Sequence, residues 1–160
     1  MKWPDEWRFE SVDECSFRLR APGETGRVLE VWYSPLPGSL PQDEMDEWVE
    51  REAAKCRAES GMQRYLGDVW SEAGPSAVLE GLIEEKGAAE WHVQMYLAMP
   101  RVLLSAEYHQ PSGSASALSM NLGSIKKSVD EAIRIFFSAR SVGEETRSKA
   151  APKKRKVRRS

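Results

Sequence analysis

Residue types that could perform catalysis or bind a metal are few in this 160-residue chain. The two histidines, His92 and His109, fall in separate predicted strands and lack the spacing of a recognised metal motif. Cys15 and Cys56 have no Cys-x-x-Cys partner, and both occupy apolar-patterned positions, which predicts small core residues rather than nucleophiles or ligands. The sequence therefore predicts no metal site, no cofactor and no enzyme.

Motifs for nucleophilic catalysis and nucleotide binding are also missing from the sequence. It contains no Gly-x-Ser-x-Gly elbow, no Gly-x-Gly-x-x-Gly loop and no Walker loop. Ser112 and Ser114 lie among small residues, a composition that favours a linker over a reactive serine. The acidic residues between Asp43 and Glu47 favour the start of a helix over a pair of catalytic carboxylates.

Positive charge is concentrated at the C-terminus. Residues 140–160 carry nine Lys or Arg and two Glu, a net charge of +7, whereas residues 1–139 carry 14 basic and 23 acidic groups, a net charge of -9. Clustered basic groups bind polyanions through Coulomb attraction and counterion release. Nucleic acid, an anionic membrane surface, an acidic protein or the acidic body of the chain itself would each attract the tail. The expected polyanion-binding residues are Lys153, Lys154, Arg155, Lys156, Arg158 and Arg159.

The N-terminus has no apolar leader, and no apolar run approaches the ~18 residues needed to span a bilayer. We therefore expect a cytoplasmic protein. The segment Pro152–Val157 resembles a monopartite nuclear import signal of the viral large-T type, so a nuclear location is expected only in a eukaryotic host.

Apolar periodicity predicts one α+β domain over residues 1–139 and a disordered basic tail over residues 140–160. The expected architecture is an antiparallel sheet of about six strands, with one helix inserted after the second strand and another at the C-terminal end. Short turns between neighbouring strands favour a hairpin and then a meander. The predicted strands are 15–20, 28–33, 63–72, 77–86, 90–99 and 102–109, and the predicted helices are 39–61 and 124–139.

Four large apolar side chains are candidates for a partner-binding groove. Trp3 and Trp7 precede the first predicted strand among polar residues, which would leave their rings exposed. Exposed tryptophans are enriched among interface anchors. Met95 and Met99 would add the adaptable apolar surface that promiscuous grooves use.

The order of these elements and several local segments resemble the PsbP-like α/β/α sandwich, and within it the bacterial DcrB- and EagR-type domains. The resemblance covers residues 8–139. It rests on Pro22-Gly23, Ser39-Leu40-Pro41, Trp48-Val49-Glu50, Trp91-His92-Val93-Gln94-Met95-Tyr96, and Ile125, Ile133 and Phe136-Phe137. EagR-type members are cytosolic chaperones that shield apolar, membrane-inserting segments of type VI secretion effectors, and the family has no catalytic residues. The lipoprotein signal of DcrB-type members is missing here, and the basic tail is not part of the family pattern.

We therefore expect a non-catalytic cytosolic chaperone or adaptor that binds an apolar or amphipathic segment of a partner protein. A homodimer formed through the sheet is compatible with this hypothesis. Two alternatives stay open. The tail would make the domain a scaffold recruited to nucleic acid or an anionic surface, or the acidic body would make it an immunity or inhibitor protein that blocks a basic toxin surface.

Overall fold

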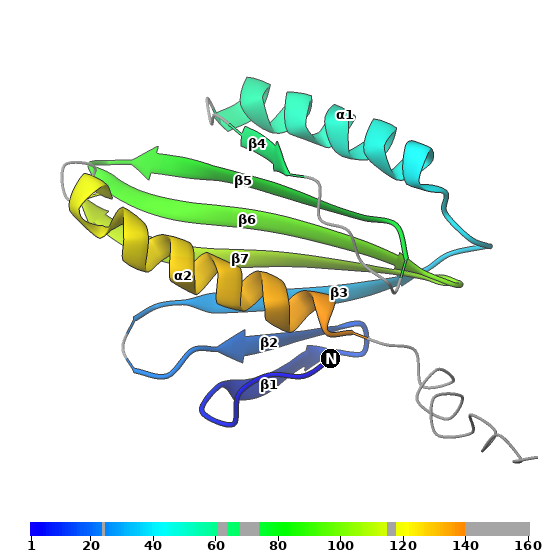
Figure 1. Cartoon of the computed structure of the whole chain (residues 1–160), viewed down its shortest axis with the longest axis horizontal. Helices are drawn as coiled ribbons and strands as arrows, with labels where there is room; N and C mark the ends of the chain where they lie inside the picture. The colour runs from blue at the N-terminus through cyan, green and yellow to red at the C-terminus, as the bar shows by residue number, and fades with distance from the viewer. Residues whose placement is uncertain (24, 61–63, 68–73, 115–117, 140–160) are drawn as a thin grey trace, which may run out of the picture.

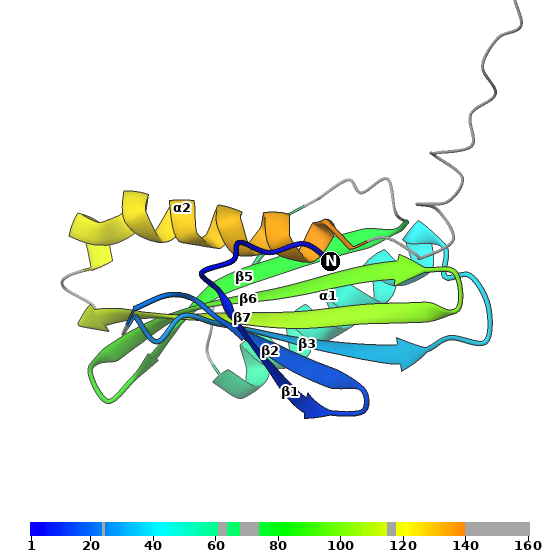
Figure 2. The ribbon, with the colours of Figure 1, turned by 90° about the horizontal axis from the view of Figure 1, so that it is seen from below.

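The computed structural model describes residues 1–23, 25–60, 64–67, 74–114 and 118–139, and over these ranges the chain forms one antiparallel sheet between two helices (Figures 1 and 2). The predicted α+β class is confirmed. The elements are β1 (Arg8–Asp13), β2 (Ser16–Arg20), β3 (Val28–Pro35), α1 (Gln42–Ser60), β4 (Arg64–Gly67), β5 (Ser76–Glu85), β6 (Ala88–Met99), β7 (Val102–Ser114) and α2 (Leu118–Phe137).

Two meanders join to make the sheet. The strand order is β1-β2-β3-β7-β6-β5-β4, so β3 pairs with β7 where the meanders meet. Helix α1 carries the chain from β3, in the interior of the sheet, to β4 at the far edge. The expected hairpin between the strands now labelled β2 and β3 and the expected meander from β4 to β7 are both confirmed by antiparallel pairing.

Two parts of the fold differ from the sequence prediction. A strand at Arg8–Asp13 adds a seventh member to the sheet, so α1 follows the third strand rather than the second. The sequence between the predicted strand 102–109 and the predicted helix 124–139 contains regular structure at both of its ends. Strand β7 continues to Ser114, and α2 begins at Leu118 rather than at Ser124.

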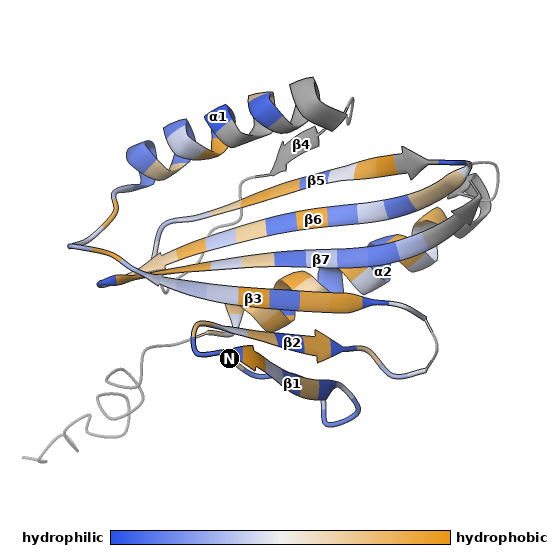
Figure 3. Cartoon of the chain, turned by 180° about the vertical axis from the view of Figure 1, so that it is seen from behind, coloured by the Kyte–Doolittle hydropathy of each residue, from blue (hydrophilic) through white to orange (hydrophobic). Residues whose placement is uncertain are grey.

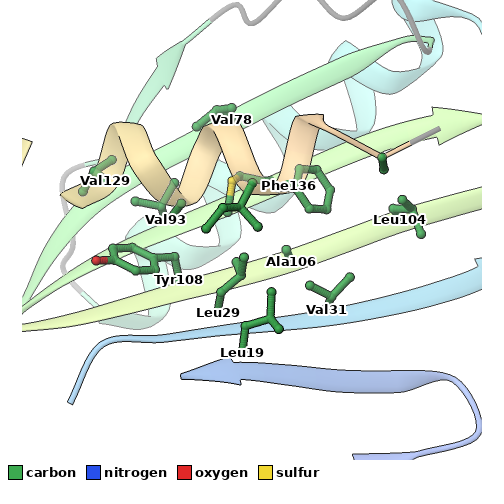
Figure 4. Packing of buried hydrophobic residues seen from close by; sticks show 14 of the residues in the cluster. Leu19, Leu29, Val31, Val78, Val93, Leu104, Ala106, Tyr108, Val129 and Phe136 are labelled. Carbon is green, nitrogen blue, oxygen red and sulfur yellow. The ribbon is translucent and has the colours of Figure 1, made fainter. Parts of the chain in front are cut away.

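The larger core lies between α2 and the sheet (Figure 4). Tyr108 and Phe136 are its largest fully buried side chains, and the strands surround them with aliphatic residues such as Leu19, Leu29 and Val93. Complete burial of a side chain of this size contributes about 1.5–3 kcal/mol. Helix α2 contributes residues spaced three and four apart, as a single apolar stripe requires. They are Ile125, Val129, Ala132, Ile135 and Phe136.

A smaller core lies between α1 and the opposite face of the sheet. Met45 and Val49 of α1 pack with Leu79 and Tyr96, and the Trp48 ring meets the Tyr96 ring edge-on at 4.7 Å between centroids. The side chain of Gln42 accepts a hydrogen bond from the backbone of Ser76 and donates one back to it, which joins the start of the helix to the start of β5.

Away from α1, this second face of the sheet carries polar side chains, and hydrophilic and hydrophobic residues mix along the strands as Figure 3 shows. One cross-strand row runs through five strands, because each of its members is the register partner of the next. Arg18 donates to Glu30 at 2.6 Å, and Arg20 donates to Glu10 at 2.8 Å. The sheet is therefore amphipathic, with an apolar α2 face and a polar α1 face. The row consists of Gln94, Glu107, Glu30, Arg18 and Glu10.

The N-terminal segment runs back along α2 and closes the folded body (Figure 2). Trp7 is buried in the larger core, and its indole Nε1 donates to Glu131 at 3.3 Å. Near the two ends, the backbone N–H of Lys2 donates to Ser138 Oγ at 2.7 Å. The Ser138 hydroxyl lies within hydrogen-bond distance of two carbonyl oxygens, that of Ile135 at 2.6 Å and that of Lys2 at 3.1 Å. Neither α1 nor α2 is long and apolar enough to cross a membrane, within the residues that the structure describes.

Candidate functional site

The two histidines face each other across β6 and β7. His92 is the register partner of His109, and both side chains lie on the polar α1 face of the sheet. The turn at Pro100 and Arg101 sets this register, because it pairs Met99 with Val102 and each histidine lies seven residues along its strand from that pair. The imidazole rings are 4.0 Å apart between centroids, and the two Nε2 atoms are 3.2 Å apart.

A carboxylate completes a triangle with these two nitrogens. Glu107, in the next row of the same face, places Oε2 at 3.4 Å from His109 Nε2 and at 3.8 Å from His92 Nε2. Its other oxygen, Oε1, accepts a hydrogen bond from Gln94 Nε2 at 3.0 Å, which fixes the orientation of the carboxylate. Three potential ligand atoms therefore converge on one point above the sheet.

A second carboxylate holds His109 from its other ring nitrogen. Glu90 Oε1 lies 2.8 Å from His109 Nδ1. An ionised carboxylate only accepts hydrogen bonds, so His109 Nδ1 carries a hydrogen and donates it. This contact directs Nε2 of the same ring toward His92 and Glu107. Glu90, His92 and His109 also offer one potential ligand atom each within 4.8 Å of one another.

The electrostatics of the cluster favour positive charge at its centre. The hydrogen bond between His109 and Glu107 is the main cause that lowers the pKa of Glu107, to about 2, and Gln94 adds to the effect. The same hydrogen bond is the main cause that raises the pKa of His109, with Glu90 acting in the same direction and burial opposing it. A proton on His109 Nε2 would thus face two acceptors, Glu107 Oε2 and His92 Nε2.

A cavity of about 650 Å³ opens beside the cluster. Its polar wall is formed by Glu90, His92, His109 and Lys86, and Ile83 and Pro111 contribute apolar surface. Gly81 of β5 is the register partner of His92, so β5 places no side chain next to this imidazole. Solvent or a small ligand can therefore approach the histidine pair from the cavity.

From the sequence alone, His92 and His109 are not predicted to form a site, because they lie on separate strands. The pairing of β6 with β7 removes that reason, since residues far apart in sequence become direct neighbours. The signal was present in the chain. Counting outward from the short turn at Pro100 and Arg101 pairs His92 with His109 and Gln94 with Glu107.

A different surface forms at the other edge of the sheet. The rings of Trp3, Phe9 and Phe17 gather on the α2 face, with centroid distances of 5.8 Å for Trp3–Phe9 and 5.5 Å for Phe9–Phe17. We call these three residues the edge aromatic cluster. Phe9 is 50% exposed although it is a large apolar side chain, and Val12 of the same strand is 52% exposed. β1 forms the end of the sheet, so its outer edge pairs with no strand among the described residues.

The predicted groove residues do not form one surface. Trp7 is only 3% exposed and Met95 is fully buried, so both belong to the α2-face core and are removed from the candidate surface. Met99 is half-buried and packs against the same core. Trp3 alone joins an exposed apolar surface, because it stacks on Phe9. Trp7 is held in this buried position by two contacts. The Arg27 guanidinium lies over its ring, and Glu131 accepts a hydrogen bond from its Nε1.

The remaining predictions concern the two cysteines and the basic tail. Cys15 is exposed rather than a core residue, because it lies in the turn between β1 and β2 and the strand alternation begins after it. The side chain of Cys56 lies outside the described residues. So does the tail, including Lys153, Lys154, Arg155, Lys156, Arg158 and Arg159.

A groove of about 280 Å³ lies between α2 and the sheet. It is lined mainly by apolar residues, including Trp91, Ile125 and Val129, and Glu80 and Lys126 lie among them. Leu122, which is 51% exposed, also lines it. This groove offers space for about one side chain of a partner, since sites that enclose a small molecule begin near 300 Å³.

Comparisons with known proteins give little context. No family model matches the sequence, and no curated protein matches it. Among solved structures, the fold is similar to a crystal structure of a protein from Bacteroides thetaiotaomicron VPI-5482, with 14% sequence identity and a TM-score of 0.47. The similarity covers 74% of this chain and 40% of that protein.

Proposed function

We propose that the chain is a non-catalytic binding protein, a chaperone or adaptor, that captures an extended apolar segment of a partner protein along β1. The observation that carries this proposal is the exposure of Phe9, stacked on Trp3, on a strand that pairs on one side only within the part of the chain that the structure describes. An exposed edge strand offers a row of backbone donors and acceptors to an incoming strand.

The edge aromatic cluster supplies the apolar anchor that such a complex needs. Phe9, Phe17 and Trp3 lie on the α2 face beyond the end of the large core, so a partner strand added to β1 would extend both the sheet and its apolar face. Aromatic rings buried at an interface contribute a large share of binding energy. Backbone pairing would set the affinity, and the rings of the edge aromatic cluster would favour apolar side chains at alternate positions of the partner strand.

The negative charge of the domain indicates which polar residues the partner segment would carry. Residues 1–139 carry a net charge of -9, so basic side chains on the solvent side of the partner strand would be favoured. The expected partner segment is thus a strand in which apolar and basic residues alternate. Two helices on opposite faces of an antiparallel sheet also support the resemblance to the PsbP-like sandwich, whose EagR-type members would make this partner a membrane-inserting segment of a type VI secretion effector.

A fluorescent peptide of alternating valine, phenylalanine and lysine tests the proposal by anisotropy, with the full chain as receptor. The peptide should bind at moderate salt, because apolar anchors are not screened. Phe9→Ser should weaken binding by about fivefold or more, since loss of an interface anchor costs more than about 1 kcal/mol. Leu122→Ser is the matched control, because Leu122 has nearly the same exposure but lines the groove beside α2.

Two results would contradict this function. A peptide of the same composition with its apolar residues at helical spacing should bind more weakly, and tighter binding of that peptide that is lost in Leu122→Ser would place recognition in the α2 groove. Sedimentation of the free chain should show a monomer. A dimer dissociated by Phe9→Ser would make a second copy of this chain, rather than a partner protein, the occupant of β1.

A further inference from the structure

We propose that His92 Nε2, His109 Nε2 and Glu107 Oε2 form a binding site for a divalent transition metal ion of the zinc class, with Glu90 positioning His109 from its other nitrogen. The three donor atoms are separated by 3.2, 3.4 and 3.8 Å. Zinc bonds of about 2.0–2.2 Å at tetrahedral angles place neighbouring donors about 3.2–3.6 Å apart. The three side chains thus need only small movements to share one ion.

The donor types select the class of metal. Two imidazole nitrogens and one carboxylate oxygen suit zinc, and also cobalt, nickel or copper. Calcium and magnesium bind oxygen ligands and surround themselves with six or more of them, which this cluster does not offer. The two facing imidazole nitrogens also need a hydrogen or a metal ion between them, since two lone pairs at 3.2 Å would repel each other. A metal ion would take the place of the proton that fills this role in its absence.

Outer contacts hold the ligands in the required orientation. His109 Nδ1 donates to Glu90 Oε1 at 2.8 Å, and Glu107 Oε1 accepts from Gln94 at 3.0 Å. Carboxylates that bind the distal nitrogen of a metal-ligating histidine fix its tautomer and orientation. Glu90 is therefore a positioning residue, because its bond to Nδ1 leaves Nε2 directed at the metal.

The scaffold is rigid, and one side of the site is open. Strands β6 and β7 lie inside the seven-stranded sheet, paired on both sides, so their side chains project from a fixed backbone. The cavity of about 650 Å³ is lined by His92 and His109 and leaves room for a fourth ligand. Three protein ligands with an open position distinguish this arrangement from closed structural zinc sites. A water molecule or a small ligand from the cavity would complete the coordination.

The site is independent of the proposed partner surface. The metal ligands lie on the α1 face of β6 and β7, whereas the edge aromatic cluster lies on the α2 face at β1. Failure of one proposal therefore leaves the other unaffected.

The test is metal binding by the full chain carrying Cys15→Ser and Cys56→Ser, which removes adventitious thiol ligands. The protein is dialysed against EDTA and titrated with Zn²⁺ by calorimetry and with Co²⁺ by visible absorption. One equivalent should bind, and Co²⁺ should develop the intense d–d bands of tetrahedral coordination. His92→Gln and His109→Gln should each weaken binding about 100-fold or more, and Glu107→Gln should weaken it more than Glu90→Gln, whose loss is expected to be about tenfold.

Glu30→Gln is the matched control, because Glu30 is the register partner of Glu107 but is bound by Arg18, and it should leave metal affinity unchanged. Circular dichroism checks that each variant is folded, and Ala variants at the two histidines provide a second set if a Gln variant is not. Absence of stoichiometric binding, or full affinity in both histidine variants, would show that the cluster is a hydrogen-bonded network only. A larger loss in Glu90→Gln than in Glu107→Gln would overturn the assignment of the third ligand.

Discussion

Arg27 joins three parts of the fold through one guanidinium group. Its Nε donates to the Tyr108 hydroxyl of β7 at 2.8 Å, and its terminal nitrogen donates to Glu131 of α2 at 2.9 Å. The guanidinium also lies over the Trp7 ring, 5.3 Å from its centroid. The Arg27 side chain is 14% exposed, so its charge depends on these partners rather than on water.

Glu131→Ala should therefore destabilise the protein by about 2–3 kcal/mol, because it leaves a mostly buried cation without its counter-charge. The loss also removes the acceptor of the Trp7 indole. Asp130→Ala, at the exposed neighbouring position of α2, should change stability by less than about 0.5 kcal/mol. Urea unfolding followed by tryptophan fluorescence measures both. Equal midpoints for the two variants would show that Arg27 is adequately solvated without Glu131.

Secondary structure could be predicted best where side-chain alternation is complete. β6 alternates buried Val93, Met95 and Leu97 with polar neighbours, and it was predicted to within two residues. β1 was missed because most of its residues are exposed on both faces, so Arg8–Asp13 carries no period-two signal. The small residues around position 115 suggested a loop, and no local pattern showed that pairing with β6 carries β7 to Ser114. Tertiary pairing decided these boundaries.

The histidine pair and the exposed Phe9 differ in how far the sequence could reveal them. The histidine pair follows from a turn of known length, so it could be obtained by counting register. The edge aromatic cluster could not, because it depends on β1 being a strand and on Trp3 folding back over Phe9. Trp7 illustrates the same limit. Its burial results from Arg27 and Glu131, which are distant in sequence.

The backbone just before strand β5 requires a glycine at position 74. Gly74 has φ +151, and a Cβ built on it would lie 2.0 Å from the Ala98 carbonyl oxygen. The next residue, Pro75, accepts a hydrogen bond from the Ala98 N–H at 2.8 Å, so the two backbones cannot separate without breaking the end of the β5–β6 ladder.

Gly74→Ala should cost about 2–4 kcal/mol, since it combines a backbone clash with a conformation that L residues rarely adopt. Gly38→Ala is the control, because a Cβ there meets no atom within 4 Å, and it should be neutral or stabilising by up to about 1 kcal/mol. Thermal unfolding by circular dichroism compares the two. An unchanged midpoint in Gly74→Ala would mean that the β5–β6 connection relaxes freely.

In the molecule as a whole, the sheet separates an apolar face from a polar face. Its α2 face holds the large core and continues to the exposed aromatic rings at β1, whereas its α1 face carries the polar row and the histidine pair. Acidic charge predominates in residues 1–139 and basic charge in residues 140–160. The alternative function, recruitment through the tail, therefore depends on a segment with a charge opposite to that of the body.

A chain that ends at Ala139 should keep the thermal midpoint of the full chain to within about 2 °C, since the sequence of residues 140–160 has no apolar pattern that predicts packing on the core. Its retention on heparin should be lost at low salt, because the basic groups that release counterions are removed. Differential scanning calorimetry and a salt gradient on the column measure the two effects. A large fall in the midpoint would show that the tail binds the acidic body as part of the folded structure.

The hydrogen-bonded contact between Lys2 and Ser138, which we call the clasp, places the two ends of the folded body side by side. A force that pulls these ends apart therefore loads the clasp first and then lifts the N-terminal segment away from α2, one contact after another. The strands of the sheet would not resist this force together, as they do when they are pulled along their length. Mechanical strength in this direction should thus be low even where thermodynamic stability is high.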